Sequence, residues 1–113
     1  MFTTTDPLKR KVTCSASTWF NHIFKGHVIM EDNIDSVKST IENPDVIYQS
    51  SQSPARDVYF SKTEATYNPL LTKVIVEFNK SGESGQVISA WPQKDISGGI
   101  EDPGGIKYVK SKL

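Results

Sequence analysis

Two histidines, His22 and His27, are the side chains of this sequence best suited to move protons near neutral pH. They lie five positions apart, and Gly26 between them is typical of the end of a helix. This spacing differs from the i, i+4 pair of a zinc-binding helix, and no nearby acid has a ligand-like spacing, so the sequence predicts no metal site. It also contains neither a phosphate-cradling glycine loop nor a serine in a nucleophile elbow.

Cleavage of RNA without a metal ion is the chemistry that fits these residues. The ribose 2′-hydroxyl is already the nucleophile, so the protein needs only a base, an acid and cations that stabilise the crowded phosphate. Histidine serves either proton-transfer role, lysine and arginine serve the phosphate, and aromatic rings stack a splayed base. Each residue also has an ordinary structural role open to it, such as His22 in helix packing and Lys73 as the partner of an acid on a neighbouring strand. Their predicted convergence on one surface favours the functional interpretation.

A β-hairpin over residues 70–91 is the element expected to position several of them. Its first strand alternates between two faces, which is the period of a strand, and its turn contains Gly82 and Gly85. Pairing that is symmetric about Gly82 places Lys73 opposite Trp91 and Ile75 opposite Ser89. A slip of one residue would exchange the two faces.

The other expected elements are two helices and several short strands. One helix covers residues 19–25, capped by Ser17 or Thr18, and the second runs from Asp32 to Asn43, ahead of Pro44. Strands are expected at 45–49 and 56–61, with shorter ones at 9–15 and 108–109. This order predicts an α+β domain in which two N-terminal helices pack on one face of an antiparallel sheet of about four strands. The face toward the helices is expected to carry Val58, Phe60, Val74, Val76, Phe78, Ile88 and Ala90, and the opposite face Tyr59, Lys73, Ser89 and Trp91.

The length of 113 residues predicts one domain, 1–113, with residues 1–7 frayed. No apolar run approaches the ~20 residues that span a bilayer, and the first ten residues lack the apolar segment of a signal peptide, so we expect a soluble protein. Cys14 is the only cysteine, which excludes an intrachain disulfide and a cysteine metal cluster.

The thirteen acidic residues balance the thirteen basic ones, which argues against a generic nucleic-acid binder. The basic residues nevertheless gather near the two ends of the chain. They form either solvated tails or a rim that faces phosphates. The two groups are Lys9, Arg10 and Lys11, and Lys107, Lys110 and Lys112.

Five segments, taken in order, resemble the phage- and toxin-associated nuclease-like domains of the barnase/EndoU/colicin/RelE (BECR) superfamily. They are WFNHIFKGH at 19–27, TIENPD at 40–45, DVYF at 57–60, LTKVIV at 71–76 and GQVISAW at 85–91. The resemblance covers Trp19 to Trp91 and implies two N-terminal helices against a four-stranded antiparallel sheet, with metal-independent RNA cleavage as the activity. Active-site residues vary widely across this superfamily, so the fold transfers better than any single role.

The resulting hypothesis is a cytoplasmic ribonuclease, or one delivered to the cytoplasm of a target cell, that cleaves single-stranded or loop RNA such as tRNA and leaves a 2′,3′-cyclic phosphate. It needs no cofactor, and its expected partners are RNA and a cognate immunity or antitoxin protein. The expected catalytic residues are His22, His27, Arg56, Lys73 and Ser89, and the expected RNA-binding residues are Tyr59, Trp91, Lys107 and Lys110. The alternatives are a non-catalytic RNA- or protein-binding module of the same fold and an interaction domain that does not bind nucleic acid.

Overall fold

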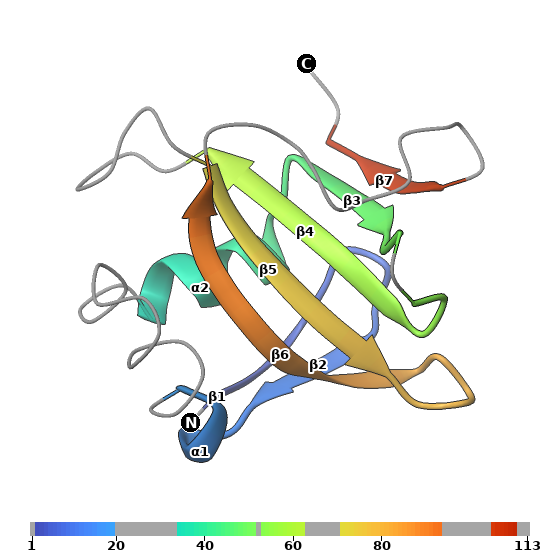
Figure 1. The fold of residues 1–113 in the computed structure, drawn as a ribbon, viewed down its shortest axis with the longest axis horizontal. Coiled ribbons are helices and arrows are strands. Elements are labelled where there is room, and N and C mark those ends of the chain that lie inside the picture. The colour runs from blue at the N-terminus through green and yellow to red at the C-terminus, as the bar shows by residue number, and fades with distance from the viewer. Residues whose placement is uncertain (1, 20–33, 52, 63–70, 94–104, 111–113) are drawn as a thin grey trace.

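A single mixed sheet dominates the computed structural model, which describes residues 2–19, 34–51, 53–62, 71–93 and 105–110 (Figure 1). The strands lie in the order β1-β2-β6-β5-β4-β3-β7. The elements are β1 (Phe2–Thr5), β2 (Lys11–Cys14), α1 (Ala16–Thr18), α2 (Ile34–Glu42), β3 (Val46–Gln49), β4 (Arg56–Lys62), β5 (Leu71–Phe78), β6 (Ser84–Gln93) and β7 (Ile106–Val109).

The expectation of two N-terminal helices on a sheet of about four antiparallel strands is wrong. Seven strands form the sheet, and β2 runs parallel to β6, while the other paired strands are antiparallel. The difference arises at the two ends of the chain, where β1 and β2 extend one edge of the sheet and β7 extends the other. The pairings of β2 with β6 and of β7 with β3 join segments far apart in sequence, so no local pattern reveals them.

The N-terminal segment is ordered rather than frayed. β1 pairs with β2 over its full length, from Phe2 opposite Cys14 to Thr5 opposite Lys11. Its run of threonines suits a strand because β-branched side chains pack well on a pleated surface.

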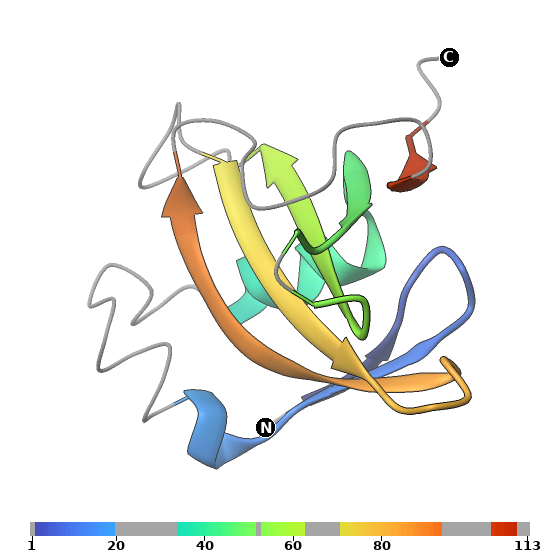
Figure 2. The same ribbon diagram turned by 45° about the vertical axis from the view of Figure 1, so that its right-hand side comes forward.

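Of the two expected helices, α2 forms and covers one face of the sheet. It lies across β4 and β5, as Figures 1 and 2 show. Its buried residues, Val37, Thr40 and Ile41, recur at helical spacing, so one side of the helix packs on the sheet. No helix in the described part of the chain is long and apolar enough to cross a membrane.

The earlier helix differs from its expected form. α1 has three residues, and its cap is Ser15, whose hydroxyl accepts a hydrogen bond from the Thr18 amide at 3.0 Å, not Ser17 or Thr18. From Phe20 onward, the helix expected over 19–25 lies outside the described residues.

The hairpin of β5 and β6 forms with a β-bulge. Lys73 pairs with Trp91 and Ile75 with Ser89, as expected, but the register then shifts by one, so that Val76 pairs with Val87. Ile88 is the extra residue of β6. Beyond this bulge the symmetric pairing about Gly82 is wrong, because a bulge sets two residues of one strand against one of the other.

The main core lies between α2 and the sheet. Its buried residues are Val12, Cys14, Trp19, Val37, Ile41, Ile47, Tyr59, Val74, Val76, Val87 and Ala90. A smaller cluster on the opposite side of the sheet contains Val46, Val58 and Phe60. We call the side turned away from α2 the outer face.

The expected facing of β4 is therefore wrong. Tyr59 pairs with Val74 and belongs to the core against α2, while Val58 and Phe60 belong to the outer face. These three residues form an unbroken apolar run that is buried on both sides, so alternation of polarity could not show which side each one faces. Ile88 is likewise displaced from the helix-facing set by the bulge.

Candidate functional site

Lys73 is the most unusual of the expected site residues, because it is a buried cation on the outer face. It is 6% exposed, and its Nζ atom lies 5.9 Å from the centre of the Phe60 ring on the neighbouring strand β4. Burial lowers the pKa of its ammonium below the ordinary value for lysine. Because Lys73 has little contact with water, its charge acts strongly on any anion that reaches it.

Ser89 lies on the same face as Lys73, on the adjacent strand β6. It pairs with Ile75 and is half-buried. Lys73 is thus a diagonal neighbour of Ser89, a relation that places Cα atoms about 7–8 Å apart across an antiparallel pair. The structure therefore brings together these two expected phosphate-binding groups. The backbone of Trp91 pairs with that of Lys73, and its side chain lies outside what the structure describes.

Arg56 shares the outer face but lies at its other end. It is four residues before Phe60, the residue that pairs with Lys73, which corresponds to about 13 Å along a strand. Its Nε atom forms an ion pair with Glu77 Oε1 at 3.0 Å. Arg56 is therefore not part of the same phosphate site as Lys73.

His22 and His27 lie outside the described residues, so the structure does not place them relative to Lys73 or Ser89. Among the described residues, no group of three or more histidine, cysteine, aspartate or glutamate side chains could hold a metal ion.

Tyr59 cannot stack on a base in this structure. Its side chain has no exposed area, and its hydroxyl donates to Asp6 Oδ2 at 2.6 Å and accepts from Arg10 Nη2 at 3.1 Å. Burial and the hydrogen bond to Asp6 raise the pKa of Tyr59, so the ring stays neutral. The assignment of this ring to RNA binding is corrected because Tyr59 faces α2.

Arg10 is the centre of a buried ion network, defined as Asp6, Arg10, Asp57, Tyr59 and Lys107. Its Nε atom contacts Asp6 Oδ2 at 2.8 Å, and its Nη1 atom contacts Asp57 Oδ2 at 2.7 Å. Lys107 Nζ lies 2.7 Å from Asp57 Oδ1, in a geometry that makes an ion pair rather than a hydrogen bond. Lys107 thus neutralises a buried carboxylate, a role that differs from the expected contact with RNA.

This network was missed from the sequence because its members are far apart. Only the i, i+4 spacing of Asp6 and Arg10 is a local sign of it. The second expected basic residue of the C-terminal group, Lys110, is exposed, and its amide donates to the carbonyl of Asp45 at 2.9 Å.

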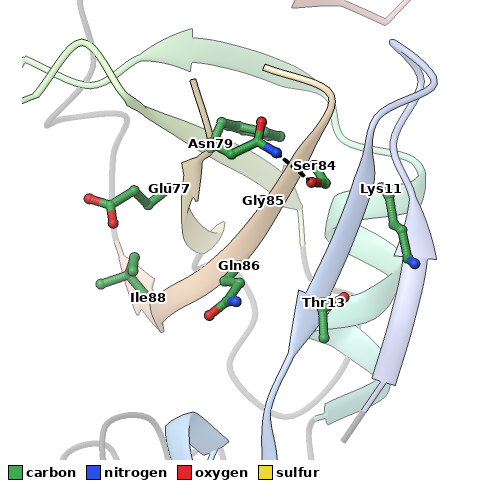
Figure 3. Close-up of a pocket in the computed structure, with 9 residues that line it drawn as sticks. Lys11, Thr13, Glu77, Asn79, Ser84, Gly85, Gln86 and Ile88 are labelled. Atoms are coloured by element: carbon green, nitrogen blue, oxygen red, sulfur yellow. Dashed lines mark hydrogen bonds between the residues drawn. The ribbon is translucent and has the colours of Figure 1, made fainter. Parts of the chain in front are cut away.

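A polar groove of about 500 Å³ crosses the outer face between β2 and β6 (Figure 3). One wall is fixed by a hydrogen bond of 2.9 Å from Asn79 Nδ2 to Ser84 Oγ. No local pattern in the sequence indicates this groove, because the groove depends on the parallel pairing of β2 with β6. It is lined by Lys11, Thr13, Glu77, Phe78, Asn79, Ser84, Gly85, Gln86 and Ile88.

The outer face thus combines a desolvated ammonium, a nearby hydroxyl and a polar groove. A cation and a hydroxyl together can hold the non-bridging oxygens of a phosphate. Comparison of the chain with protein-family models, with curated proteins and with solved structures finds no match.

Proposed function

We propose that this protein is a metal-independent endoribonuclease whose substrate lies on the outer face of β5 and β6. The observation that carries the proposal is the burial of Lys73 next to Ser89. An ammonium and a hydroxyl on neighbouring strands can contact the non-bridging oxygens of one phosphate. The negative charge of a bound phosphate would raise the pKa of Lys73 toward its ordinary value.

In the proposed reaction, the ribose 2′-oxygen attacks the adjacent phosphorus and the 5′-oxygen leaves. The products are a 2′,3′-cyclic phosphate and a 5′-hydroxyl, so no water molecule is consumed. Lys73 and Ser89 stabilise the charge that builds on the non-bridging oxygens. His22 and His27, assigned from the sequence alone, act as base and acid, because histidine titrates near neutral pH.

The ordered resemblance of residues 19–91 to BECR nuclease-like domains is the ground for proposing RNA as the substrate. The fold that the resemblance implies, two N-terminal helices on a four-stranded antiparallel sheet, differs from the seven-stranded mixed sheet of this protein. By the same resemblance, single-stranded or loop RNA such as tRNA is the proposed substrate, and a cognate immunity or antitoxin protein is a proposed partner. The cytoplasm of the producing or of a target cell is the proposed place of action.

The test is incubation of the purified protein with total tRNA in excess EDTA. Cleavage that leaves 2′,3′-cyclic phosphate ends is expected for the wild type. Lys73→Met should lower kcat/KM by about 10²–10³, the range seen when one preorganised charge-stabilising donor is removed. Lys38→Met, on α2 at the opposite side of the sheet, is the matched control and should cleave normally.

No cleavage by the wild type, or cleavage that survives His22→Ala, would remove the proposed mechanism. Equal rates for Lys73→Met and Lys38→Met would remove Lys73 from it.

A second candidate is an RNA-binding module without turnover. It is favoured by the ion pair of Arg56 with Glu77, which engages a cation expected to take part in cleavage. A salt-sensitive complex with RNA that is never cleaved would support this candidate over the enzyme.

A further inference from the structure

We propose that the polar groove between β2 and β6 is a subsite for single-stranded RNA, in which Lys11 binds a backbone phosphate and Gln86 hydrogen-bonds a base or ribose of a flanking nucleotide. This inference rests on the proposed function, because it assumes that the RNA also reaches Lys73. A volume of about 500 Å³ falls within the range of roughly 300–1,000 Å³ that is typical of ligand pockets.

The groove contains polar side chains with unused hydrogen-bonding capacity. Within the described part of the chain, neither the ammonium of Lys11 nor the amide of Gln86 has a hydrogen-bond or ion-pair partner, and both side chains are exposed. The ammonium offers three donors, and the amide offers both donors and an acceptor, which is the combination needed to recognise a phosphate and the edge of a base. Figure 3 shows the two side chains on neighbouring strands that border the groove.

The part of the outer face beside the groove is positively charged. Over the described side chains of β2, β4, β5 and β6, Glu77 is the one carboxylate of the outer face, and Arg56 neutralises it at 3.0 Å. Lys11 therefore leaves this part of the face positive, although the whole chain has no net charge. A local positive field on a neutral protein favours a polyanion at that surface.

The groove is continuous with the proposed phosphate site. Ser89 is the diagonal neighbour of Lys73, Ile88 directly precedes Ser89 along β6, and Gln86 lies opposite Glu77. The bulge adds Ile88 to the lining of the groove, where it supplies apolar surface between the two polar regions. Lys73 and Glu77 are four residues apart on β5, about 13 Å, so a short stretch of single-stranded RNA can contact both regions.

The neutral polar lining specifies the ligand further. Thr13, Ser84 and Asn79 carry hydroxyl and amide groups, which suit a ribose or a base edge and would serve an apolar peptide poorly. The groove is therefore assigned to a nucleotide unit, with the phosphate at Lys11.

Binding of a fluorescent seven-nucleotide single-stranded RNA, measured by anisotropy in EDTA at about 50 mM salt, tests the subsite. Lys11→Met should weaken binding roughly five- to tenfold and reduce the slope of log K against log[salt] by about 0.7, the loss of one phosphate contact. Gln86→Ala should weaken binding without changing that slope. Lys11→Arg keeps the charge and should bind like the wild type, and Lys38→Met on α2 is the control for a lost cation elsewhere.

The subsite is overturned if Lys11→Met and Lys38→Met bind RNA equally, or if the wild type does not bind the RNA. The binding and cleavage assays together distinguish failure of the subsite from failure of the proposed enzymatic function. An RNA-cleaving protein that is indifferent to Lys11→Met refutes the groove alone, whereas a protein that binds through Lys11 and never cleaves refutes the enzyme alone.

Discussion

Replacing Arg10 by methionine should cost about 3 kcal/mol of unfolding free energy. The side chain of Arg10 is 14% exposed, and the two carboxylates that it contacts, Asp6 and Asp57, are 0% and 1% exposed. Removing one partner of a buried ion pair destabilises proteins by about 3–5 kcal/mol, because a charge is left buried without compensation. The methionine would keep apolar contact with Phe78, whose ring centre lies 4.0 Å from the guanidinium carbon.

The lower end of that range applies because both carboxylates keep other partners. Asp6 still accepts from the amides of Leu8 at 3.0 Å and of residue 10 at 2.8 Å, and from the Tyr59 hydroxyl at 2.6 Å. Asp57 still contacts Lys107 at 2.7 Å.

Arg56→Met is the matched control, since it also removes an arginine-carboxylate pair. The side chains of Arg56 and Glu77 are 35% and 47% exposed, so losing their contact at 3.0 Å should cost less than about 1 kcal/mol. Urea unfolding followed by circular dichroism measures both variants, with equal m-values as the check that unfolding exposes the same surface. High salt should shrink the effect of Arg56→Met and leave that of Arg10→Met. Losses within about 0.5 kcal/mol of each other would refute the argument from burial.

Three further predictions concern Cys14, Tyr59 and two glycines of the β5–β6 hairpin. Cys14 is 0% exposed and burial raises the pKa of its thiol, so a disulfide reagent should label it only after unfolding; labelling at the same rate in the native protein would contradict this burial. Because the pKa of Tyr59 is raised in the folded state, its contribution to stability should be complete below pH ~10 and fall above it by up to about 1.4 kcal/mol per pH unit. Urea titrations at several alkaline pH values should show a steeper decline in the wild type than in Tyr59→Phe, which keeps the buried Cys14 thiol, and equal slopes would contradict the burial of this hydroxyl. Gly85→Ala should cost about 1–3 kcal/mol of unfolding free energy, since a Cβ there would lie 2.8 Å from Val76 Cγ1. Gly82→Ala, at φ 72° in open space, should cost about 1 kcal/mol. Thermal unfolding that shows the larger loss for Gly82→Ala would contradict the close packing at Gly85.

Local patterns predicted the elements of this fold better than their assembly. The spacing of Val37 and Ile41 marks α2, and the alternation around Val74 marks β5, because both periods reflect burial of one side. Predicting this helix and these strands requires only the pattern of residues that are close in the sequence. The parallel pairing of β2 with β6 and the pairing of β7 with β3 depend on contacts between distant segments, so the expected sheet of about four antiparallel strands was wrong.

The candidate site was likewise predictable only where it depends on the pairing within one hairpin. The register of Lys73 with Trp91 followed from the hairpin, and Ser89 was correctly placed on the same face as Lys73. Tyr59 was placed on the wrong face because its apolar neighbours give no alternation. Nothing local shows that Lys107 reaches Asp57 or that Lys11 borders a groove with β6, since each of these relations joins segments far apart in the sequence.

The long-range contacts of the N-terminal strands also affect how the protein folds during synthesis. Tyr59 is made 53 residues after Asp6, its hydrogen-bond partner. At about 5–20 residues per second, the ribosome takes roughly 3–10 s to cover that interval. β6 is made later still. β2 can therefore pair with β1 early, but it is one of the last strands to join the rest of the sheet, through β6. A nascent chain stalled before β6 would therefore hold β1 and β2 as a hairpin with an unpaired edge, open to chaperones and proteases.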